Sequence, residues 1–288
     1  MARAGGVWRG LLAMLALFAG AGGVPSVLAQ AAATLPCTLE PGPTRAVAAV
    51  LDGETVRLDD GIEVRLIGAL TPRATDGGAE GGAAAWPPET EARAALERLV
   101  DGRSVALAFA GPRADRYGRV LAHLFVEQAS EQVWVQGRLV ETGHARAYSL
   151  AGSDACIGAL LARERGARNT GLGLWSHAAY QVRPADRPTE LARYRHTFQV
   201  VRGRVERGRG TRGLAILELA SGERAAAAEG TSQRGAFRVV WRWAVGRSAA
   251  LDQPDLWRGR NVVIRGWIEA RGGPEIEIMA AGQLENDE

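Results

Sequence analysis

The sequence predicts a mainly β protein with added helices (α+β), in which a small helix-covered β-barrel is followed by a second small β-barrel. Two observations lead to this prediction. Residues 45–126 hold short strand patterns separated by tight turns and interrupted by one helical pattern. Residues 198–279 hold five more strand patterns with little helix, which favours a barrel of the oligonucleotide/oligosaccharide-binding type. With 288 residues, of which 47% are hydrophobic, the chain is long enough for two cores.

The first barrel is expected to open with a β-meander. Its strands lie at 45–51, 55–58 and 62–67, joined by Asp-Gly turns. A Gly/Ala/Pro-rich stretch, 73–88, is interpreted as a long flexible loop. A helix then begins at Pro88, because apolar residues recur at helical spacing as far as Val100. Further strands are expected at 104–109 and 119–126, and further helices at 133–141 and 155–167.

The second barrel follows a polar, proline-containing stretch at 177–196, which is interpreted as a linker. Its strands are expected at 198–205, 214–219, 237–243, 261–267 and 275–279. The complete division is a signal peptide at 1–29, a mobile lead-in at 30–44, a first domain at 45–176, the linker, and a second domain at 197–285.

The N-terminal segment indicates export. Arg3 and Arg9 precede a short uncharged apolar run, and Val27-Leu28-Ala29 forms a small-residue cleavage motif. The sequence therefore predicts a periplasmic or secreted protein, with no membrane attachment after cleavage. An uncleaved anchor is the alternative. Apart from this segment, the chain contains no uncharged apolar run long enough for a membrane-spanning helix.

The charge balance predicts no strong overall attraction to nucleic acid. All 35 basic residues are arginine, and removing the signal segment lowers the net charge from +3 to +1. Any anion site must therefore arise from local clustering of arginines, whose planar side chains bind phosphate in a bidentate manner.

The two cysteines, Cys37 and Cys156, are expected to form a disulfide, because paired cysteines are common in exported proteins. Two separate buried thiols are the alternative. The sequence has no Cys-x-x-Cys motif, and its four histidines show no zinc-ligand spacing.

Four segments, taken together in their order and spacing, resemble the staphylococcal nuclease (thermonuclease) family. They are Val50-Leu51-Asp52-Gly53-Glu54-Thr55-Val56, Val64-Arg65-Leu66-Ile67-Gly68, Asp115-Arg116-Tyr117-Gly118-Arg119 and Gly173-Leu174-Trp175. The resemblance covers roughly residues 45–176. It implies a five-stranded barrel of the oligonucleotide-binding type with three helices, and calcium-dependent hydrolysis of phosphodiesters.

The resemblance also implies roles for individual residues. Arg65 and Arg119 stand where the family grips phosphate, and Glu54 stands where the family has a calcium-binding acid. The Thr71 carbonyl is a residual candidate metal ligand. Tyr148 lies near the position at which the family stacks a tyrosine on the nucleotide.

The chain departs from the family at Leu70-Thr71-Pro72-Arg73. Leu70 replaces a calcium aspartate, and Arg73 replaces the catalytic glutamate. A guanidinium would repel calcium and cannot act as a general base. Arg65, Arg73 and Arg119 are instead expected to converge on an anion that needs no calcium. Asp76 or Glu80 are alternative acids if the loop folds inward.

Three functions therefore remain open. The preferred one is an exported thermonuclease-family protein that binds a nucleic acid or another phosphate-bearing anion with weak or no hydrolysis. It needs no cofactor. The alternatives are an atypical active nuclease, which would require Ca²⁺, and a structural or interaction protein with an unknown protein partner. Basic strands with Trp241, Trp243 and Trp267 in the second barrel suit single-strand binding, but nearby acids make solvated strand faces the preferred interpretation.

Overall fold

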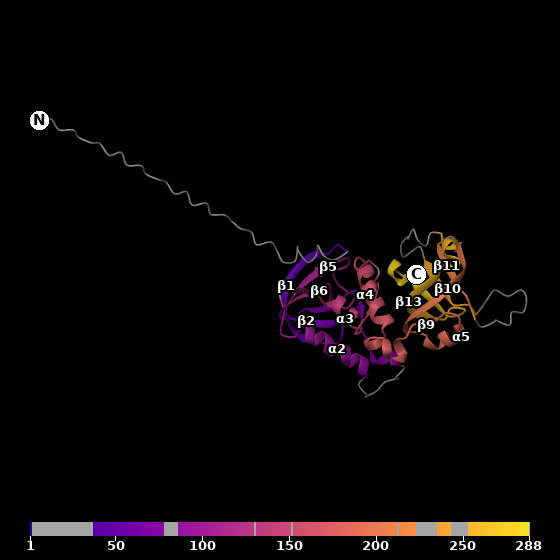
Figure 1. Cartoon of the computed structure of the whole chain (residues 1–288), viewed down its shortest axis with the longest axis horizontal. Coiled ribbons are helices and arrows are strands. Elements are labelled where there is room, and N and C mark those ends of the chain that lie inside the picture. Colours follow the sequence, from indigo (N-terminus) through magenta and orange to yellow (C-terminus); the bar gives the residue numbers. More distant parts are fainter. Residues whose placement is uncertain are drawn as a thin grey trace, which may run out of the picture.

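The computed structural model describes Met1 and residues 37–77, 86–129, 131–150, 152–211, 213–222, 235–242 and 253–287. The predicted signal peptide beyond Met1, Glu80 and Trp243 lie outside these residues. Two closed barrels account for most of the described chain, and they lie side by side in Figure 1.

The first barrel is a ring of five strands, as the sequence predicts. The strands are β1 (Glu40–Val50), β2 (Thr55–Leu58), β3 (Glu63–Leu66), β5 (Ser104–Phe109) and β6 (Val120–Gln128). They lie in the order β3-β2-β1-β5-β6, and a parallel pairing of β3 with β6 closes the ring. A further strand, β7 (Glu131–Trp134), extends the sheet beyond β6.

Three helices pack around the first barrel. They are α2 (Pro87–Val100), α3 (Val135–Glu141) and α4 (Ile157–Asn169). Each buries the apolar side of its helical pattern, as Leu96, Leu139 and Leu160 show at 1% exposure or less. These leucines join the strand residues in one continuous core.

The second barrel has the same strand order as the first. Its strands are β10 (Phe198–Thr211), β11 (Leu214–Leu219), β12 (Arg238–Arg242), β13 (Asn261–Glu269) and β14 (Glu275–Ile278). The ring runs β10-β11-β12-β14-β13 and closes by pairing β13 with β10. In each ring the third and fifth strands are parallel and the other neighbours are antiparallel. The structure therefore confirms two barrels of the oligonucleotide-binding type.

Short elements complete the two sheets and their connections. The strands are β4 (Ala69–Leu70), β8 (Arg146–Ala147), β9 (Arg183–Pro184) and β15 (Leu284–Asn286). The helical turns are η1 (Ala74–Gly77), η2 (Gly173–Ser176), η3 (Ala178–Tyr180), α5 (Pro188–Leu191), η4 (Ala192–Tyr194), η6 (Pro254–Trp257) and η7 (Ala281–Gln283). None of the helices in the described part of the chain is both long and apolar enough to cross a membrane.

Two predicted segments differ from the structure. The first strand begins at Glu40 rather than Arg45, because pairing with β5 continues to Glu40 opposite Phe109. The stretch 177–196 is folded rather than a plain linker, since it contains η3, β9, α5 and η4. Tyr180 and Leu191 within it are buried, so these apolar residues fix the segment against the barrels.

The predicted disulfide is present between Cys37 and Cys156, whose Cα atoms are 5.1 Å apart. Cys156 lies directly before α4, so the bridge ties the start of the described chain to that helix. A closed loop of this length stabilises the fold by about 4–5 kcal/mol in the chain-entropy model.

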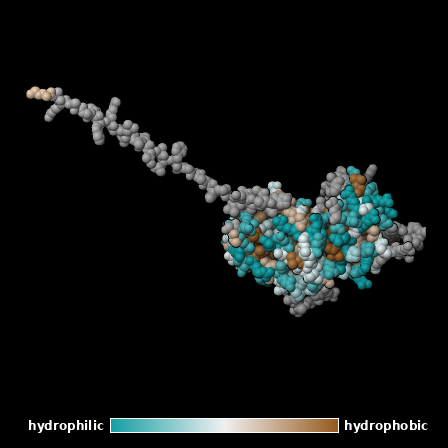
Figure 2. Space-filling model, viewed as in Figure 1, coloured by the Kyte–Doolittle hydropathy of each residue, from teal (hydrophilic) through white to brown (hydrophobic). Residues whose placement is uncertain are grey.

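The barrels meet through α4 and a shared apolar cluster. In Figure 1, α4 lies between the first barrel and β13 of the second. Arg265 on β13, fully buried, contacts the equally buried Glu164 on α4, with Nη1 2.7 Å from Oε1. The cluster contains Leu70, Ala167, Leu174, Trp175, Tyr180, Phe198, Val200 and Val263. The face of the molecule in Figure 2 is mostly hydrophilic, with separate small hydrophobic areas over both barrels.

Candidate functional site

A cavity of about 660 Å³ contains the predicted site residues. Its walls include the first turn of the meander, the segment after β4, and the turn before β6. The predicted residues that line it are Glu54, Arg65, Thr71, Arg73, Arg119 and Tyr148. Glu54, Arg65, Arg73 and Arg119, which the sequence places in one pocket, therefore line the same cavity.

Glu54 lies at the centre of the polar contacts, because its carboxylate is 2% exposed and must be neutralised there. The Asp52 side chain accepts a 2.8 Å hydrogen bond from the Glu54 backbone N–H and so forms the turn. Arg65 Nη2 lies 3.3 Å from Glu54 Oε1, and Arg73 Nη2 pairs with the same oxygen. The Thr71 backbone N–H donates to Oε2 at 3.2 Å. Both carboxylate oxygens are therefore occupied by protein donors.

Arg73 is held in its charged form by this arrangement. Burial alone would lower its pKa, but the charge and hydrogen bond of Glu54, with smaller contributions from Asp52 and Asp76, raise the pKa above its ordinary value. Its side chain is still 51% exposed. Arg73 therefore neutralises the buried carboxylate with one end of the guanidinium while the rest remains open to the cavity.

Arg119 reaches the cavity through a different partner. Its Nε and Nη2 lie 2.8 and 2.7 Å from Asp115 Oδ2, and the Asp115 side chain also accepts the backbone N–H groups of Tyr117 and Arg119. Burial would raise the Asp115 pKa, but these hydrogen bonds together with the Arg119 charge lower it. Gly118 has a φ of +82°, a conformation that completes this tight turn without strain. Arg119 is thus fixed on the cavity wall but does not contact Glu54.

The residues present do not fit a calcium site. Calcium prefers six to eight oxygen ligands, and several of these are normally carboxylates. Here Glu54 is engaged by two arginines and a backbone N–H, and Leu70 offers no side-chain oxygen. Asp76 accepts hydrogen bonds from Arg146 at 3.0 Å and from the Tyr180 hydroxyl at 3.2 Å. The described residues contain no group of three or more His, Cys, Asp or Glu side chains placed to hold a metal.

Leu70 has a structural role that the sequence alone does not reveal. It is 4% exposed and belongs to the apolar cluster that also contains Phe198, Val200 and Val263 of the second barrel. The strand β4 that carries it pairs with β8, which places Leu70 opposite Arg146. Arg146 in turn donates to the Phe198 carbonyl at 2.9 Å. Leu70 is therefore part of the apolar contact between the two barrels.

Two aromatic residues border the cavity beside the arginines. Tyr148 follows β8 and is partly buried; burial raises its pKa, although Arg65 and Arg73 oppose the shift. Trp267, from β13, is the second. The two ring centroids are 5.6 Å apart at an angle of 89°. The second barrel therefore contributes directly to the wall of a cavity formed mostly by the first.

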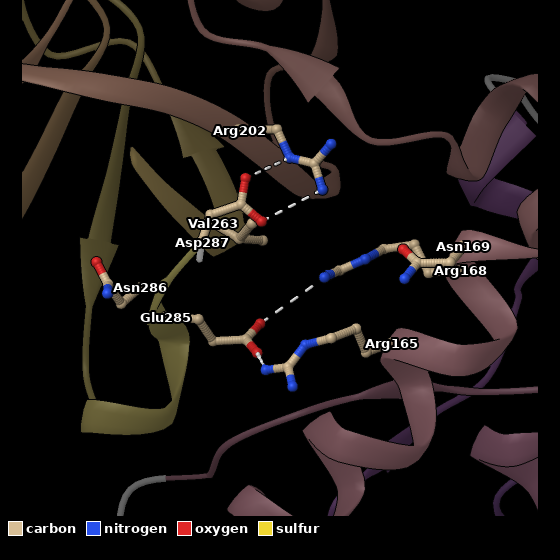
Figure 3. Close-up of a pocket in the computed structure, with 8 residues that line it drawn as sticks. All are labelled: Arg165, Arg168, Asn169, Arg202, Val263, Glu285, Asn286 and Asp287. Carbon is tan, nitrogen blue, oxygen red and sulfur yellow. Dashed lines mark hydrogen bonds and ion pairs between the residues drawn. The ribbon is translucent and has the colours of Figure 1, made fainter. Parts of the chain in front are cut away.

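A second pocket, of about 230 Å³, lies where α4 meets the second barrel (Figure 3). Its arginines are paired. Arg202 Nε lies 2.8 Å from Asp287, and Arg165 Nη2 lies 3.4 Å from Glu285. Arg168 Nη1 lies 4.0 Å from Glu285 and 3.5 Å from Glu164. Each of the three arginines that line this pocket has an acidic partner, and the ion pairs join α4 and the second barrel, so the pocket belongs to the interface between the barrels.

Ion pairs also engage several arginines on the described strands of the second barrel. Arg207 and Arg209 contact Glu218, Arg238 contacts Glu275, and Arg242 contacts Glu277. Trp241 is buried in the barrel core. These contacts are typical of solvated strand faces. Of the two described tryptophans that the sequence suggested for single-strand binding, Trp241 and Trp267, only Trp267 is exposed and lines the cavity.

The first ring, its three helices and its arginine-lined cavity define a barrel of the oligonucleotide-binding type with a site suited to anions. A scan of protein families matches residues 63–177 to the family described as Staphylococcal nuclease homologue. This part of the chain thus matches a staphylococcal nuclease domain, in agreement with the motifs. A search of curated proteins found no match to the chain.

Trp267 lines the site although its sequence position does not indicate this. Its position on a predicted strand among other tryptophans suggested only a strand face. Leu70, which stands where the family has an acid, was the local sequence signal that an apolar surface of the second barrel packs beside the site.

Proposed function

We propose that the chain is an exported thermonuclease-family protein that binds a phosphate-bearing ligand, such as a nucleic acid, without calcium and with weak or no phosphodiester hydrolysis. The observation that carries this proposal is the state of Glu54. Its two oxygens are satisfied by Arg65, Arg73 and the Thr71 N–H. The charge that a metal would supply beside this carboxylate is already supplied by Arg73.

The same geometry supports anion binding. Arg65, Arg73 and Arg119 line one cavity, with side-chain exposures of 23%, 51% and 22%. Four arginines (Arg65, Arg73, Arg116 and Arg119) and three acids (Asp52, Glu54 and Glu89) line the cavity, so its lining carries a net charge of +1, and Asp115 beside it pairs with Arg119. Guanidinium groups fixed by carboxylates are suited to phosphate, because their remaining N–H groups form charge-assisted hydrogen bonds in a preset orientation.

Hydrolysis is disfavoured because the acids that the structure describes in and beside the cavity, Asp52, Glu54, Asp76 and Glu89, all accept hydrogen bonds from protein groups. Loss of a positioned general base typically lowers the rate by about 10²–10⁴-fold. Glu54 is engaged, Asp76 is bonded to Arg146 and Tyr180, and Glu89 accepts the Ala74 N–H at 3.1 Å. The disulfide is compatible with an oxidising compartment and so supports export.

The test is equilibrium binding of a fluorescently labelled single-stranded oligonucleotide in the presence of a calcium chelator. We expect binding that weakens with rising salt, and that weakens further in Arg65→Ala and Arg119→Ala. The matched control is Arg57→Ala on β2, because Arg57 pairs with Glu63 at 2.9 Å and does not line the cavity. Binding that requires calcium would favour the atypical nuclease. Absence of binding under all conditions would favour a structural or interaction protein.

A further inference from the structure

Trp267 lies outside the buried core of the second barrel and is partly exposed. It is 42% exposed although the rings of Tyr148 and Phe198 pack against it at centroid distances of 5.6 and 5.1 Å. Both contacts are nearly perpendicular, at 89° and 78°. A substantial part of the indole surface is therefore presented at the cavity that holds Arg65 and Arg73.

The position of Trp267 is fixed by buried contacts between the barrels. Arg265 precedes it by two residues on β13, so both side chains project from the same face of the strand. Arg265 donates to the Ala147 carbonyl at 3.2 Å and to Glu164, and Glu164 also accepts the Ala147 backbone N–H. Ala147 is the residue before Tyr148. The same cluster of polar contacts therefore sets the position of both aromatic residues before any ligand binds.

We propose that Trp267 of the second barrel adds a base-binding ring beside Tyr148, the position near which the family stacks a tyrosine, so that the cavity is a composite site of both barrels for unpaired nucleotides of a single-stranded nucleic acid. This inference rests on the proposed function, in which Arg65, Arg73 and Arg119 hold the phosphate. The first barrel then supplies the phosphate contacts, and the second barrel supplies a ring for the base.

The size and chemistry of the cavity favour this ligand over a simple anion. A volume of about 660 Å³ is in the range of sites that hold drug-sized ligands, whereas inorganic phosphate would occupy a small part of it. Arginines next to the exposed Trp267 and the partly buried Tyr148 match a ligand that joins a phosphate to a flat ring. Stacking on such rings tolerates any base, and it requires a base that is not already stacked within a duplex.

The experiment compares two labelled single strands of equal length in chelator, one with normal bases and one with abasic sites throughout. Trp267→Ala is expected to weaken binding of the normal strand about 5- to 150-fold and to leave the abasic strand unchanged. Trp267→Phe keeps an aromatic ring and should retain most of the affinity. Leu256→Ala is the control, because Leu256 is an exposed apolar residue of the same barrel, at 62% exposure.

Each outcome decides between the proposals. If both strands bind and Trp267→Ala affects neither, or affects both equally, the base-binding role of Trp267 is wrong and the arginine site stands. If neither strand binds the unmodified protein, the proposed function and this inference both fail. Thermal unfolding of each variant shows whether Trp267→Ala has disturbed the interface, and Trp267→Phe then gives the decisive comparison.

Discussion

Replacing Leu70 by aspartate is the most informative single change, because this position has two competing explanations. One holds that Leu70 is only a lost metal ligand. The structure supports the other, in which Leu70 packs in the apolar cluster shared by the two barrels and is 4% exposed. We therefore expect Leu70→Asp to destabilise the protein.

The magnitude follows from burial. Removing a buried leucine side chain costs about 2–5 kcal/mol in the free energy of unfolding. The new carboxylate adds the cost of burying a charge, which is offset in part by Arg73 and Arg146 nearby. We expect a total loss of at least about 3 kcal/mol at neutral pH, and loosening of the contact between the barrels.

The assay is denaturant unfolding of Leu70→Asp and of the uncharged control Leu70→Asn between pH 4 and pH 7. Burial raises the folded-state pKa of the new carboxylate above its unfolded value, so its protonated form is favoured in the fold. The free energy of unfolding of Leu70→Asp is therefore highest at low pH, where the new carboxyl is protonated, and it falls as the pH rises through the folded-state pKa of that carboxyl. Leu70→Asp should thus fall below Leu70→Asn as the pH rises. Wild-type stability for Leu70→Asp at pH 7 would refute the packing role.

Three further outcomes are expected. Arg265→Ala should lower the free energy of unfolding by about 3–5 kcal/mol in denaturant titration, because the fully buried Glu164 loses its nearest cationic partner and keeps only the longer ion pair with Arg168; unchanged stability would contradict the role of this interface. Burial lowers the pKa of His123 to about 4, so the protein loses stability as the pH falls below 6.5, by about 3 kcal/mol at pH 4; His123→Gln should reduce this slope in denaturant titrations, and an unchanged slope would contradict the burial of a neutral His123. Replacing Cys37 and Cys156 by serine should lower stability by about 2–5 kcal/mol, and an unchanged melting temperature would argue against the bridge.

The sequence predicted what depends on local patterns. Alternating apolar residues placed the strands of both rings, and the Asp115–Gly118 turn was expected because its residue types favour tight turns. The motifs also brought Glu54, Arg65 and Arg119 to one place. These features follow from short-range spacing within a single barrel.

The rest depends on contacts between distant parts of the chain. Phe198 and Leu70 share a cluster although 128 positions separate them, and no local pattern records such a contact. No local pattern indicates the contact between Trp267 and Tyr148 either. The sequence placed Arg119 in the same pocket as Arg65 and Arg73, but it did not indicate that Arg119 pairs with Asp115. Motif spacing does not determine which acid an arginine contacts.

Single-turnover cleavage of a labelled single strand, with and without calcium, tests the central claim most directly. The claim is that Arg73 supplies the charge beside Glu54 and leaves the site without a metal or a general base. We expect the unmodified protein to bind the strand under both conditions and to show no appreciable cleavage with calcium. Calcium-dependent cleavage at rates ordinary for a nuclease, abolished by Arg73→Ala, would contradict it and make Arg73 part of a working active site.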